Sequence, residues 1–374
     1  MVKNNFQNIV LMFLMCSTNT SFLFAKEENA RRAFLVACGD QHVEKSLNLP
    51  KAVEDMDKFK ESLLRTGFKS EDIVYLQGKA GVELRYQPTK LAILEELSLV
   101  IKGLNAGDTL VVALNGHGIH PKGAKTSYFV PLDGRIEKEK TLLAMDGEES
   151  IFGMLREAVK KKAKVILVVG ACRNAINGNV QALNQMDLED PSVPPEGIAA
   201  IYSCGVGQKT YFDAKGGSYF YEHLSKAWLG EYHPEEEKIS LELVFKAVSE
   251  KTFQDVRIAY AEAQKPEMRR QYTGEWLVAT NDVLVRQELK TFLSFEDRGQ
   301  ELLARNYLEK QGQGRLLAWK NAALKGSPES ILLYAWCLYK GILLVKNQDE
   351  AFKWFYKSAE LGNAHGMEWV GDCY

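Results

Sequence analysis

From residue 33 onward, short apolar segments alternate with amphipathic ones, and this alternation restricts the fold more than any other feature of the chain. Residues 33–38 (AFLVAC), 109–114 (TLVVAL) and 165–169 (VILVV) are continuous apolar runs, which are typical of buried parallel strands. Further strands are expected at 72–76, 198–203 and 276–280, and helices at 52–64, 91–101, 150–159, 219–229 and 241–253. Strands that alternate with helices predict an α/β fold in which helices cover both faces of a mostly parallel, six-stranded sheet.

The first 25 residues have the composition of a secretory signal. Lys3 precedes the apolar residues 9–15, and Ala25 precedes the charged residues 26–28. We therefore expect cleavage after Ala25 and export of the mature chain, either to the periplasm or out of the cell, whereas an uncleaved chain would stay in the cytoplasm. No later segment approaches the ~20 apolar residues of a membrane helix, so no transmembrane helix is expected in the mature chain. A net charge of -2 gives no electrostatic reason to expect a nucleic-acid partner.

The chain has six cysteines, of which Cys16 would leave with the signal. The other five are odd in number and widely spaced, so they form no disulfide framework and at least one thiol stays free. They are Cys38, Cys172, Cys204, Cys337 and Cys373. No pair of cysteines and no cysteine–histidine cluster has the spacing of a metal site, so we expect no bound metal. His120 follows His117 by three residues, but no third ligand accompanies these two.

Residues 284–374 are expected to form a purely helical region after an α/β domain that spans residues 30–283. The segment 322–326 (AALKG) returns as 358–362 (SAELG), an offset of 36 residues. A period in the mid-thirties is typical of stacked helix–turn–helix repeats. Residues 354–364 (WFYKSAELGNA) resemble the signature of the SEL repeats, a tetratricopeptide-like family, which implies binding of a protein partner. A plain helical hairpin is the alternative. The last residue falls midway through a repeat, so we expect the chain to be part of a longer repeat protein.

A histidine and a cysteine stand where two of the expected strands end. Residues 116–118 (GHG) follow one apolar strand, and residues 171–173 (ACR) follow another. Neighbouring parallel strands lie ~4.8 Å apart, so if these two are neighbours, His117 and Cys172 meet at one edge of the sheet. A lone cysteine is more often a buried small hydrophobe. Both residues at strand ends, each flanked by small residues, instead indicate a catalytic pair, because a thiolate attacks carbonyl carbons and an imidazole can move its proton.

Residues 32–282 resemble the caspase and metacaspase superfamily of cysteine peptidases. Residues 114–118 (LNGHG) are similar to the family's S-G-H-G, and residues 170–173 (GACR) are similar to its Q-A-C-R-G or D-A-C-R. The histidine and the cysteine are 55 positions apart, close to the roughly 50 expected of caspases. Residues 128–133 (YFVPLD) are similar to the segment that follows the histidine in bacterial members. The second half of the family pattern is recognisable in 202–208 and in 264–266 (QKP).

This resemblance implies a caspase-like three-layer sandwich that hydrolyses peptide bonds with a dyad of His117 and Cys172. In the family's arrangement, the backbone N–H groups of Gly118 and Cys172 form the oxyanion hole. The expected partners are a protein or peptide substrate and a protein bound through the repeats. No cofactor is expected, and nothing in the sequence indicates activation by calcium. The main alternative is a catalytically silent caspase-like scaffold, and a third hypothesis is another cysteine hydrolase of similar architecture.

One departure from the family pattern bears on specificity. Metacaspases that cut after Arg or Lys carry an aspartate two residues before the catalytic cysteine, where this chain has Gly170. Asp40, which follows the first strand, and Asp213 are the candidates by position for another acid in the substrate pocket. Asp55 and Asp57 are expected on the solvated face of the first helix.

The segment between the two halves bears on maturation. No Lys or Arg occurs from residue 174 to residue 208, so an enzyme that cuts after basic residues could not process itself there. We therefore expect an uncleaved single-chain enzyme without a strong preference for Arg or Lys at the cleavage site.

Overall fold

The computed structural model describes residues 29–40, 47–120, 126–171, 194–205, 208–234 and 236–372. The expected secretory signal at 1–25, Cys172, Cys373 and the segment 174–193 lie outside these residues. No helix in the described ranges combines the length and the apolar character that crossing a membrane requires.

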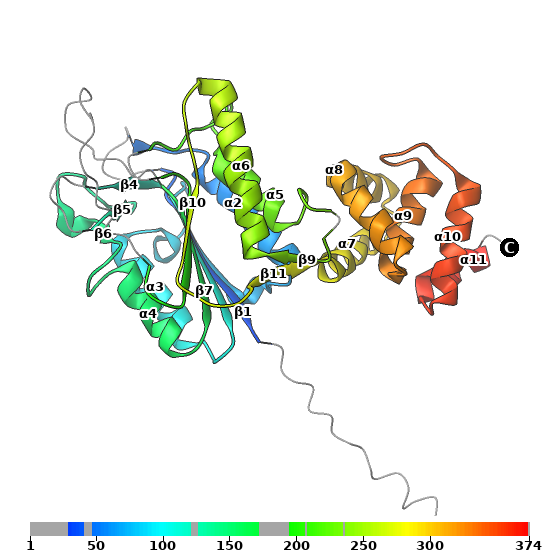
Figure 1. Ribbon diagram of the computed structural model, residues 1–374, viewed down its shortest axis with the longest axis horizontal. Coiled ribbons are helices and arrows are strands. Elements are labelled where there is room, and N and C mark those ends of the chain that lie inside the picture. The colour runs from blue at the N-terminus through cyan, green and yellow to red at the C-terminus, as the bar shows by residue number, and fades with distance from the viewer. Residues whose placement is uncertain are drawn as a thin grey trace, which may run out of the picture.

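A six-stranded sheet forms the centre of the α/β domain, as the alternation of segments predicts (Figure 1). Its strands are β1 (Arg31–Ala37), β2 (Ile73–Gln77), β3 (Thr109–Asn115), β7 (Lys164–Gly170), β8 (Ile198–Tyr202) and β10 (Glu267–Arg270). They lie in the order β10-β8-β7-β3-β1-β2, and every neighbouring pair is parallel except β10 and β8. The prediction of a mostly parallel six-stranded sheet is therefore confirmed.

The sixth strand of this sheet is not the one predicted. The segment 276–280 does contain a strand, β11 (Leu277–Thr280), but this strand pairs with β9 (Lys238–Ser240) in a separate two-stranded sheet. The edge position belongs to β10, whose residues EMRR are mostly charged and are not fully buried. Charged side chains protect an edge strand from pairing with another chain. Because β10 contains no apolar run, it was not predicted as a strand of the sheet.

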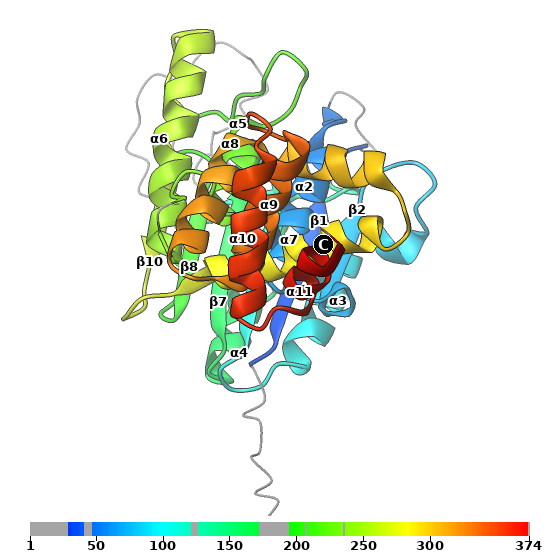
Figure 2. The same cartoon turned by 90° about the vertical axis from the view of Figure 1, so that its right-hand side faces the viewer.

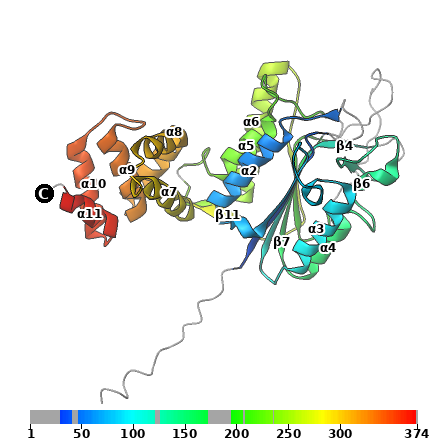
Figure 3. The same ribbon diagram turned by 180° about the vertical axis from the view of Figure 1, so that it is seen from behind.

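Helices cover both faces of the sheet (Figures 1 and 3). One face carries α2 (Ala52–Arg65), α5 (Tyr219–Trp228) and α6 (Leu241–Tyr260), and the other carries α3 (Lys90–Lys102) and α4 (Ile151–Lys160). Alternate residues of β1 supply the two cores, because successive side chains of a strand point to opposite faces. Leu35 packs in the core beneath α2 and α5, while Phe34 and Val36 pack in the core beneath α3 and α4.

A smaller antiparallel sheet follows β3 and covers one end of the α3/α4 layer. It consists of β4 (His117–Ile119), β5 (Tyr128–Val130) and β6 (Leu143–Ala144). Phe129 and Leu143 join the α3/α4 core, while Ile119, Val130 and Leu142 belong to an apolar cluster of their own. This sheet was not predicted from the sequence, because strands of two or three residues are too short to show an alternating pattern. Short 3-10 helices lie at Ser70–Asp72, Leu84–Tyr86 and Glu139–Thr141.

After β11 the chain is helical to the end of the described residues, as expected (Figure 2). The helices are α7 (Asn281–Glu296), α8 (Glu301–Leu324), α9 (Pro328–Lys340), α10 (Gln348–Glu360) and α11 (Ala364–Asp372). Gly312 has a φ of 75° inside α8, so this helix is two shorter helices in series. The ends of α8 and α10 lie 36 residues apart, and so do the first residues of α9 and α11. Gly326 and Gly362 follow α8 and α10 with positive φ, at the same offset.

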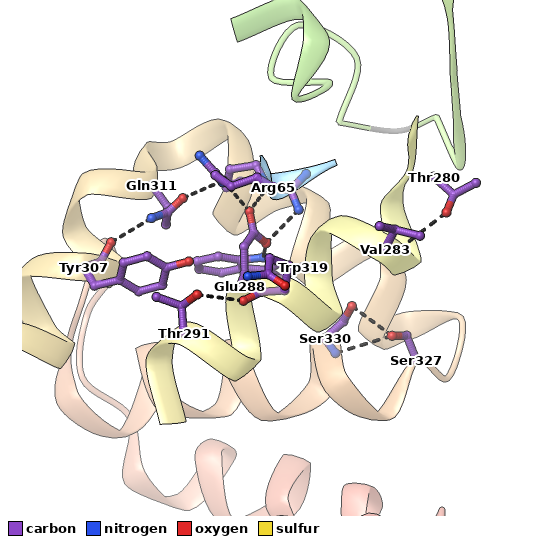
Figure 4. Close-up of polar contacts among 12 residues, drawn as sticks. Arg65, Thr280, Val283, Glu288, Thr291, Tyr307, Gln311, Trp319, Ser327 and Ser330 are labelled. Atoms are coloured by element: carbon purple, nitrogen blue, oxygen red, sulfur yellow. Dashed lines mark hydrogen bonds and ion pairs between the residues drawn. The ribbon is translucent and has the colours of Figure 1, made fainter. Parts of the chain in front are cut away.

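A buried ion cluster joins the helical region to the α/β domain (Figure 4). Glu288 of α7 is fully buried and accepts hydrogen bonds from Arg315 Nε at 2.9 Å, Arg315 Nη2 at 2.8 Å and Trp319 Nε1 at 2.7 Å. From the α/β domain, Arg65 of α2 donates to Glu288 at 2.6 Å and to Gln311 Oε1 at 2.8 Å. Burial by itself raises the pKa of Glu288, but the charges of Arg315 and Arg65 outweigh it and hold that pKa below its ordinary value.

Candidate active site

The register of β3 and β7 brings together the starts of the two loops in which catalytic residues were expected. β3 and β7 are parallel neighbours in which Asn115 pairs with Gly170, the last residue of each strand. The N–H of Gly116 donates to the carbonyl of Gly170 at 3.4 Å, which ties the two chain exits together. His117 follows Asn115 by two residues, and in the sequence Cys172 follows Gly170 by two. Cys172 itself lies outside the described residues.

A backbone carbonyl orients the half-buried His117. The Nε2 atom of His117 lies 2.9 Å from the carbonyl oxygen of Leu47, in the segment that precedes α2. A carbonyl oxygen can only accept a hydrogen bond, so Nε2 carries the hydrogen and the neutral ring keeps its lone pair on Nδ1. Leu47 packs its side chain on the apolar cluster of the small sheet that contains His117, which fixes the position of its carbonyl. No acidic side chain is needed for this orientation.

The glycine before His117 is required by close packing. An added Cβ at Gly116 would lie 2.9 Å from the ring of Phe129 and 3.1 Å from Cys38 Cβ, and both of these residues are buried. Asn115, which stands where the family has serine, donates its side-chain amide to the carbonyl of Ala52 at 3.0 Å. This bond holds the end of β3 against the first residue of α2. Gly118, the expected oxyanion donor, is buried in β4 opposite Phe129.

Gly170 lies against an aromatic ring that occupies the space of its missing side chain. An added Cβ would lie 2.1 Å from Cε2 of Tyr221, far inside van der Waals contact. Tyr221 of α5 is fully buried, and its hydroxyl donates to the carbonyl of Leu114 at 3.0 Å. With Tyr221 in this position, a side chain at the place that carries the specificity aspartate in metacaspases would overlap the ring.

Asp40 lies at the same edge of the sheet but is displaced from β7. Its backbone N–H donates to the carbonyl of Gly78 at 2.7 Å, just beyond the end of β2. In the strand order, β1 is separated from β7 by β3, so the ends of β1 and β7 are roughly 10 Å apart. Asp40 and Gly170 are therefore not adjacent, although both follow strands at the carboxyl edge.

Asp213 lies in the loop before α5, close to a buried partner that the sequence did not indicate. Its Oδ1 atom accepts the N–H groups of Lys215 at 2.7 Å and Gly217 at 2.9 Å. Asp55 Oδ2 accepts the N–H of Ser218 at 2.9 Å, so both acids hold the same loop. An added Cβ at Gly217 would lie within 3.5 Å of both carboxylates.

The burial of Asp55 corrects one prediction. Asp57 is exposed as expected, but Asp55 is only 2% exposed. Asp55 lies one helical turn before Phe59 and therefore shares the inward face of α2, which the apolar spacing of the sequence did not reveal. Burial raises the pKa of Asp55 to about 6, and the charges of Asp213 and Glu54 raise it further against the opposing effects of Ser218 and Lys58.

Comparison with known proteins decides the family. The sequence pattern of the caspase domain family (Peptidase_C14) matches residues 30–275, more than half of the chain. The chain belongs to the caspase family. Among solved structures, caspase-1 from Spodoptera frugiperda is similar, with 13% sequence identity and a TM-score of 0.46 over 67% of this chain and 90% of that chain. A search of curated proteins found no match.

The second half of the caspase domain supports the end of β7 from the neighbouring strand. Ser203, at the end of β8, donates its hydroxyl to the carbonyl of Ala171 at 3.2 Å. Gln264, the glutamine of the QKP segment, is fully buried and spans this loop. Its Nε2 donates to the carbonyl of Ser203 at 2.9 Å, and its Oε1 accepts the N–H of Tyr211 at 2.7 Å. The motif residue therefore has a positioning role that its sequence similarity alone did not explain.

Two structural features of the candidate site were missed from the sequence. The carbonyl of Leu47 leaves no signal, because every residue has a carbonyl group. Tyr221 left only a weak signal, since an aromatic residue near the start of an amphipathic helix is normally interpreted as part of the hydrophobic core.

His120, which was considered as a metal ligand, contacts Ser127, with Nδ1 at 3.3 Å from the hydroxyl oxygen. Within the described ranges, no group of three or more His, Cys, Asp or Glu side chains is arranged to hold a metal ion.

Proposed function

We propose that this caspase-family chain is a cysteine endopeptidase in which His117 and Cys172 form the catalytic dyad. The observation that carries the proposal is the pairing of Asn115 with Gly170 at the ends of β3 and β7. It brings His117 to the strand end that leads, two residues later in the sequence, to Cys172. The hydrogen bond from His117 Nε2 to Leu47 supports the same role, because it leaves Nδ1 as the basic nitrogen.

The reaction that follows from these groups has two stages. His117 Nδ1 takes the proton of the Cys172 thiol, and the thiolate sulfur attacks the peptide carbonyl carbon. The N–H groups of Gly118 and Cys172 would donate to the oxyanion of the tetrahedral intermediate. His117 then returns the proton to the leaving amine, and an acyl-enzyme remains. A water molecule, deprotonated by His117, attacks the thioester, and Cys172 leaves with the proton restored.

The other thiols of the described chain are poor candidates for the nucleophile. Cys38, Cys204 and Cys337 are buried and form no disulfide. Burial raises the pKa of Cys38 far above its usual range and raises that of Cys337 to about 12. Buried thiols of high pKa contain almost no thiolate at neutral pH and are therefore inert.

The test compares single and double variants of the dyad. Cys172→Ala should abolish peptide cleavage and labelling by a thiol-reactive peptide probe, and adding His117→Ala should cost little more, because the two residues act as one unit. Cleavage that survives Cys172→Ala would exclude the proposed dyad. The alternative is a catalytically silent scaffold, which is favoured by the Tyr221 ring in the space beside Gly170. A silent scaffold would leave the wild-type protein unlabelled by the probe.

We propose two further assignments outside the caspase domain. The recurrence of helix ends at 36 residues supports SEL-like repeats that bind a protein partner. Residues 1–25 would act as a cleaved export signal, which sequencing the N-terminus of the mature protein tests. A mature chain that begins before residue 26 would contradict the second assignment.

A further inference from the structure

We propose that Tyr221 closes the space for the substrate side chain on the acyl side of the scissile bond, so that the enzyme cuts after small, uncharged residues. This inference rests on the proposed peptidase function and names the substrate class of the same site.

The fold restricts the direction in which that side chain can leave the reacting centre. The side chain is attached to the atom next to the attacked carbonyl carbon, so it must lie beside the ends of β3 and β7. On the α3/α4 side, the small sheet covers this edge, and Phe129 packs against Gly116 with no free space between them. The other side carries Ala52 at the start of α2 and the loop before α5. Among the residues that the structure describes, those on the α2/α5 side therefore border the space into which a substrate side chain would extend.

Tyr221 already occupies that side. Its ring meets the bare Cα of Gly170, where an added Cβ would lie 2.1 Å away, and its hydroxyl bonds to the carbonyl of Leu114 at 3.0 Å. Gly170 belongs to β7 and Leu114 belongs to the neighbouring strand β3. Leu114 directly precedes Asn115, the residue that pairs with Gly170. The ring therefore spans both strands directly beneath the points where the two catalytic loops begin. Phe59 and Phe220 hold it there, with ring centroids at 6.1 Å and 5.3 Å.

The volume that the ring occupies disfavours any long side chain, whatever its charge. Asp55 and Asp213 lie in or beside the loop before α5, where Asp55 accepts from Ser218 and Asp213 accepts from Lys215 and Gly217. These bonds leave the carboxylates able to accept further hydrogen bonds, so the exclusion of a basic side chain rests on volume alone. A long side chain would need the volume of a fully buried ring in a close-packed core, which cannot yield without strain. Glycine, alanine and serine need almost none of this volume.

The experiment uses the purified full-length protein and a set of thiol-reactive peptidyl probes. The probes differ only in the residue attached to the reactive group, which is Ala, Ser, Leu or Arg. The wild-type protein should be labelled at least about tenfold faster by the Ala and Ser probes than by the Leu and Arg probes. Tyr221→Ala should raise labelling by the Leu and Arg probes relative to the Ala probe by a similar factor. Tyr221→Phe, which keeps the ring, should retain the wild-type ranking.

The outcomes separate this inference from the function on which it rests. Fastest labelling of the wild-type protein by the Leu or Arg probe would overturn the role of Tyr221 and leave the peptidase proposal standing, whether or not the Tyr221→Ala variant folds. A folded Tyr221→Ala variant with an unchanged ranking would overturn it as well. If no probe labels the wild-type protein more than Cys172→Ala, the peptidase function fails and the inference fails with it.

Discussion

Gly170 has no side chain, and this leaves room for the ring of Tyr221. Gly170→Ala places a methyl group 2.1 Å from the ring of Tyr221, and overpacking of this kind costs about 1–3 kcal/mol of unfolding free energy. We expect this loss in urea unfolding at neutral pH. The double variant Gly170→Ala/Tyr221→Ala should show a favourable coupling, because the second change removes the atom that clashes.

The control for this prediction is a glycine that contacts nothing. Gly371→Ala adds a methyl group with no neighbour within 4 Å and should change stability little or raise it slightly, since alanine favours helix. Equal effects of the two alanine substitutions would show that the contact with Tyr221 is not the cause.

The buried carboxyl of Asp55 predicts a pH-dependent stability. Burial raises its pKa to about 6, whereas an unfolded aspartate titrates near 3.9. Between these values the folded state keeps a proton that the unfolded state has lost, so this group lowers stability progressively as pH rises and costs most above about pH 6. Asp55→Asn should therefore stabilise the protein more at pH 7.5 than at pH 4. Thermal unfolding at both values measures this, and an advantage confined to pH 4 would contradict it.

At the scale of elements, the Glu288 cluster holds the helical region on the end of α2. Arg315 provides two of the hydrogen bonds to the buried carboxylate, and Arg65 provides one from the caspase domain. Arg315→Met should cost up to about 3–5 kcal/mol, the loss on breaking a buried ion pair, because Glu288 keeps only Arg65 and Trp319 as partners. Chemical unfolding of the full-length protein measures this loss.

A matched substitution in the first part of α8, before Gly312, provides the control. Arg305 pairs with Glu309 at 2.8 Å on the surface, where both side chains are 44% exposed. Arg305→Met should change stability by less than about 1 kcal/mol, since exposed pairs contribute little. A loss as large as that of Arg315→Met would show that burial of the pair is not the decisive property.

In the whole molecule, the candidate active site and the helical region lie at opposite ends of α2. The start of α2 contacts Asn115 beside the site, and its last residue, Arg65, contacts Glu288. A chain that ends at residue 282 should therefore keep peptide hydrolysis within a few fold. It should also unfold at lower temperature, because Leu284 leaves the core beneath α2 and Arg65 loses its buried partner. A folded truncation without activity would contradict this separation of roles.

The segment between the two halves of the caspase domain predicts how the whole chain matures. Residues 174–208 contain no Lys or Arg, but they include small residues such as Ala175, Gly178 and Ala182. An enzyme that requires a basic residue could not cut this segment, whereas one that cuts after small residues could. Any self-made cut within 174–208 should therefore follow Gly, Ala or Ser. N-terminal sequencing of the fragments from incubated wild-type protein checks this, and a cut after a large residue that Cys172→Ala abolishes would contradict it.

The local pattern of residue types was sufficient to predict the alternation of strands and helices. It was also sufficient to predict that His117 and Gly170 lie at strand ends. Hydrophobic periodicity reports which faces of an element are buried, and this property is carried by residues close together in the chain. It failed at β10, where an edge strand needs no apolar run, and at Asp55, where a buried carboxylate is satisfied by the backbone of a distant loop.

Local residue patterns therefore predicted the main alternation of strands and helices, the fold class and the candidate site residues at strand ends, but not β4, β5, β6, β9 or β10. Three contacts emerged from the three-dimensional arrangement: Asn115 lies beside Gly170 on neighbouring strands, the carbonyl of Leu47 orients His117, and Tyr221 fills the space at Gly170. Each of these contacts joins residues far apart in the chain. Their meeting depends on strand register and close packing, which no local pattern of residue types encodes.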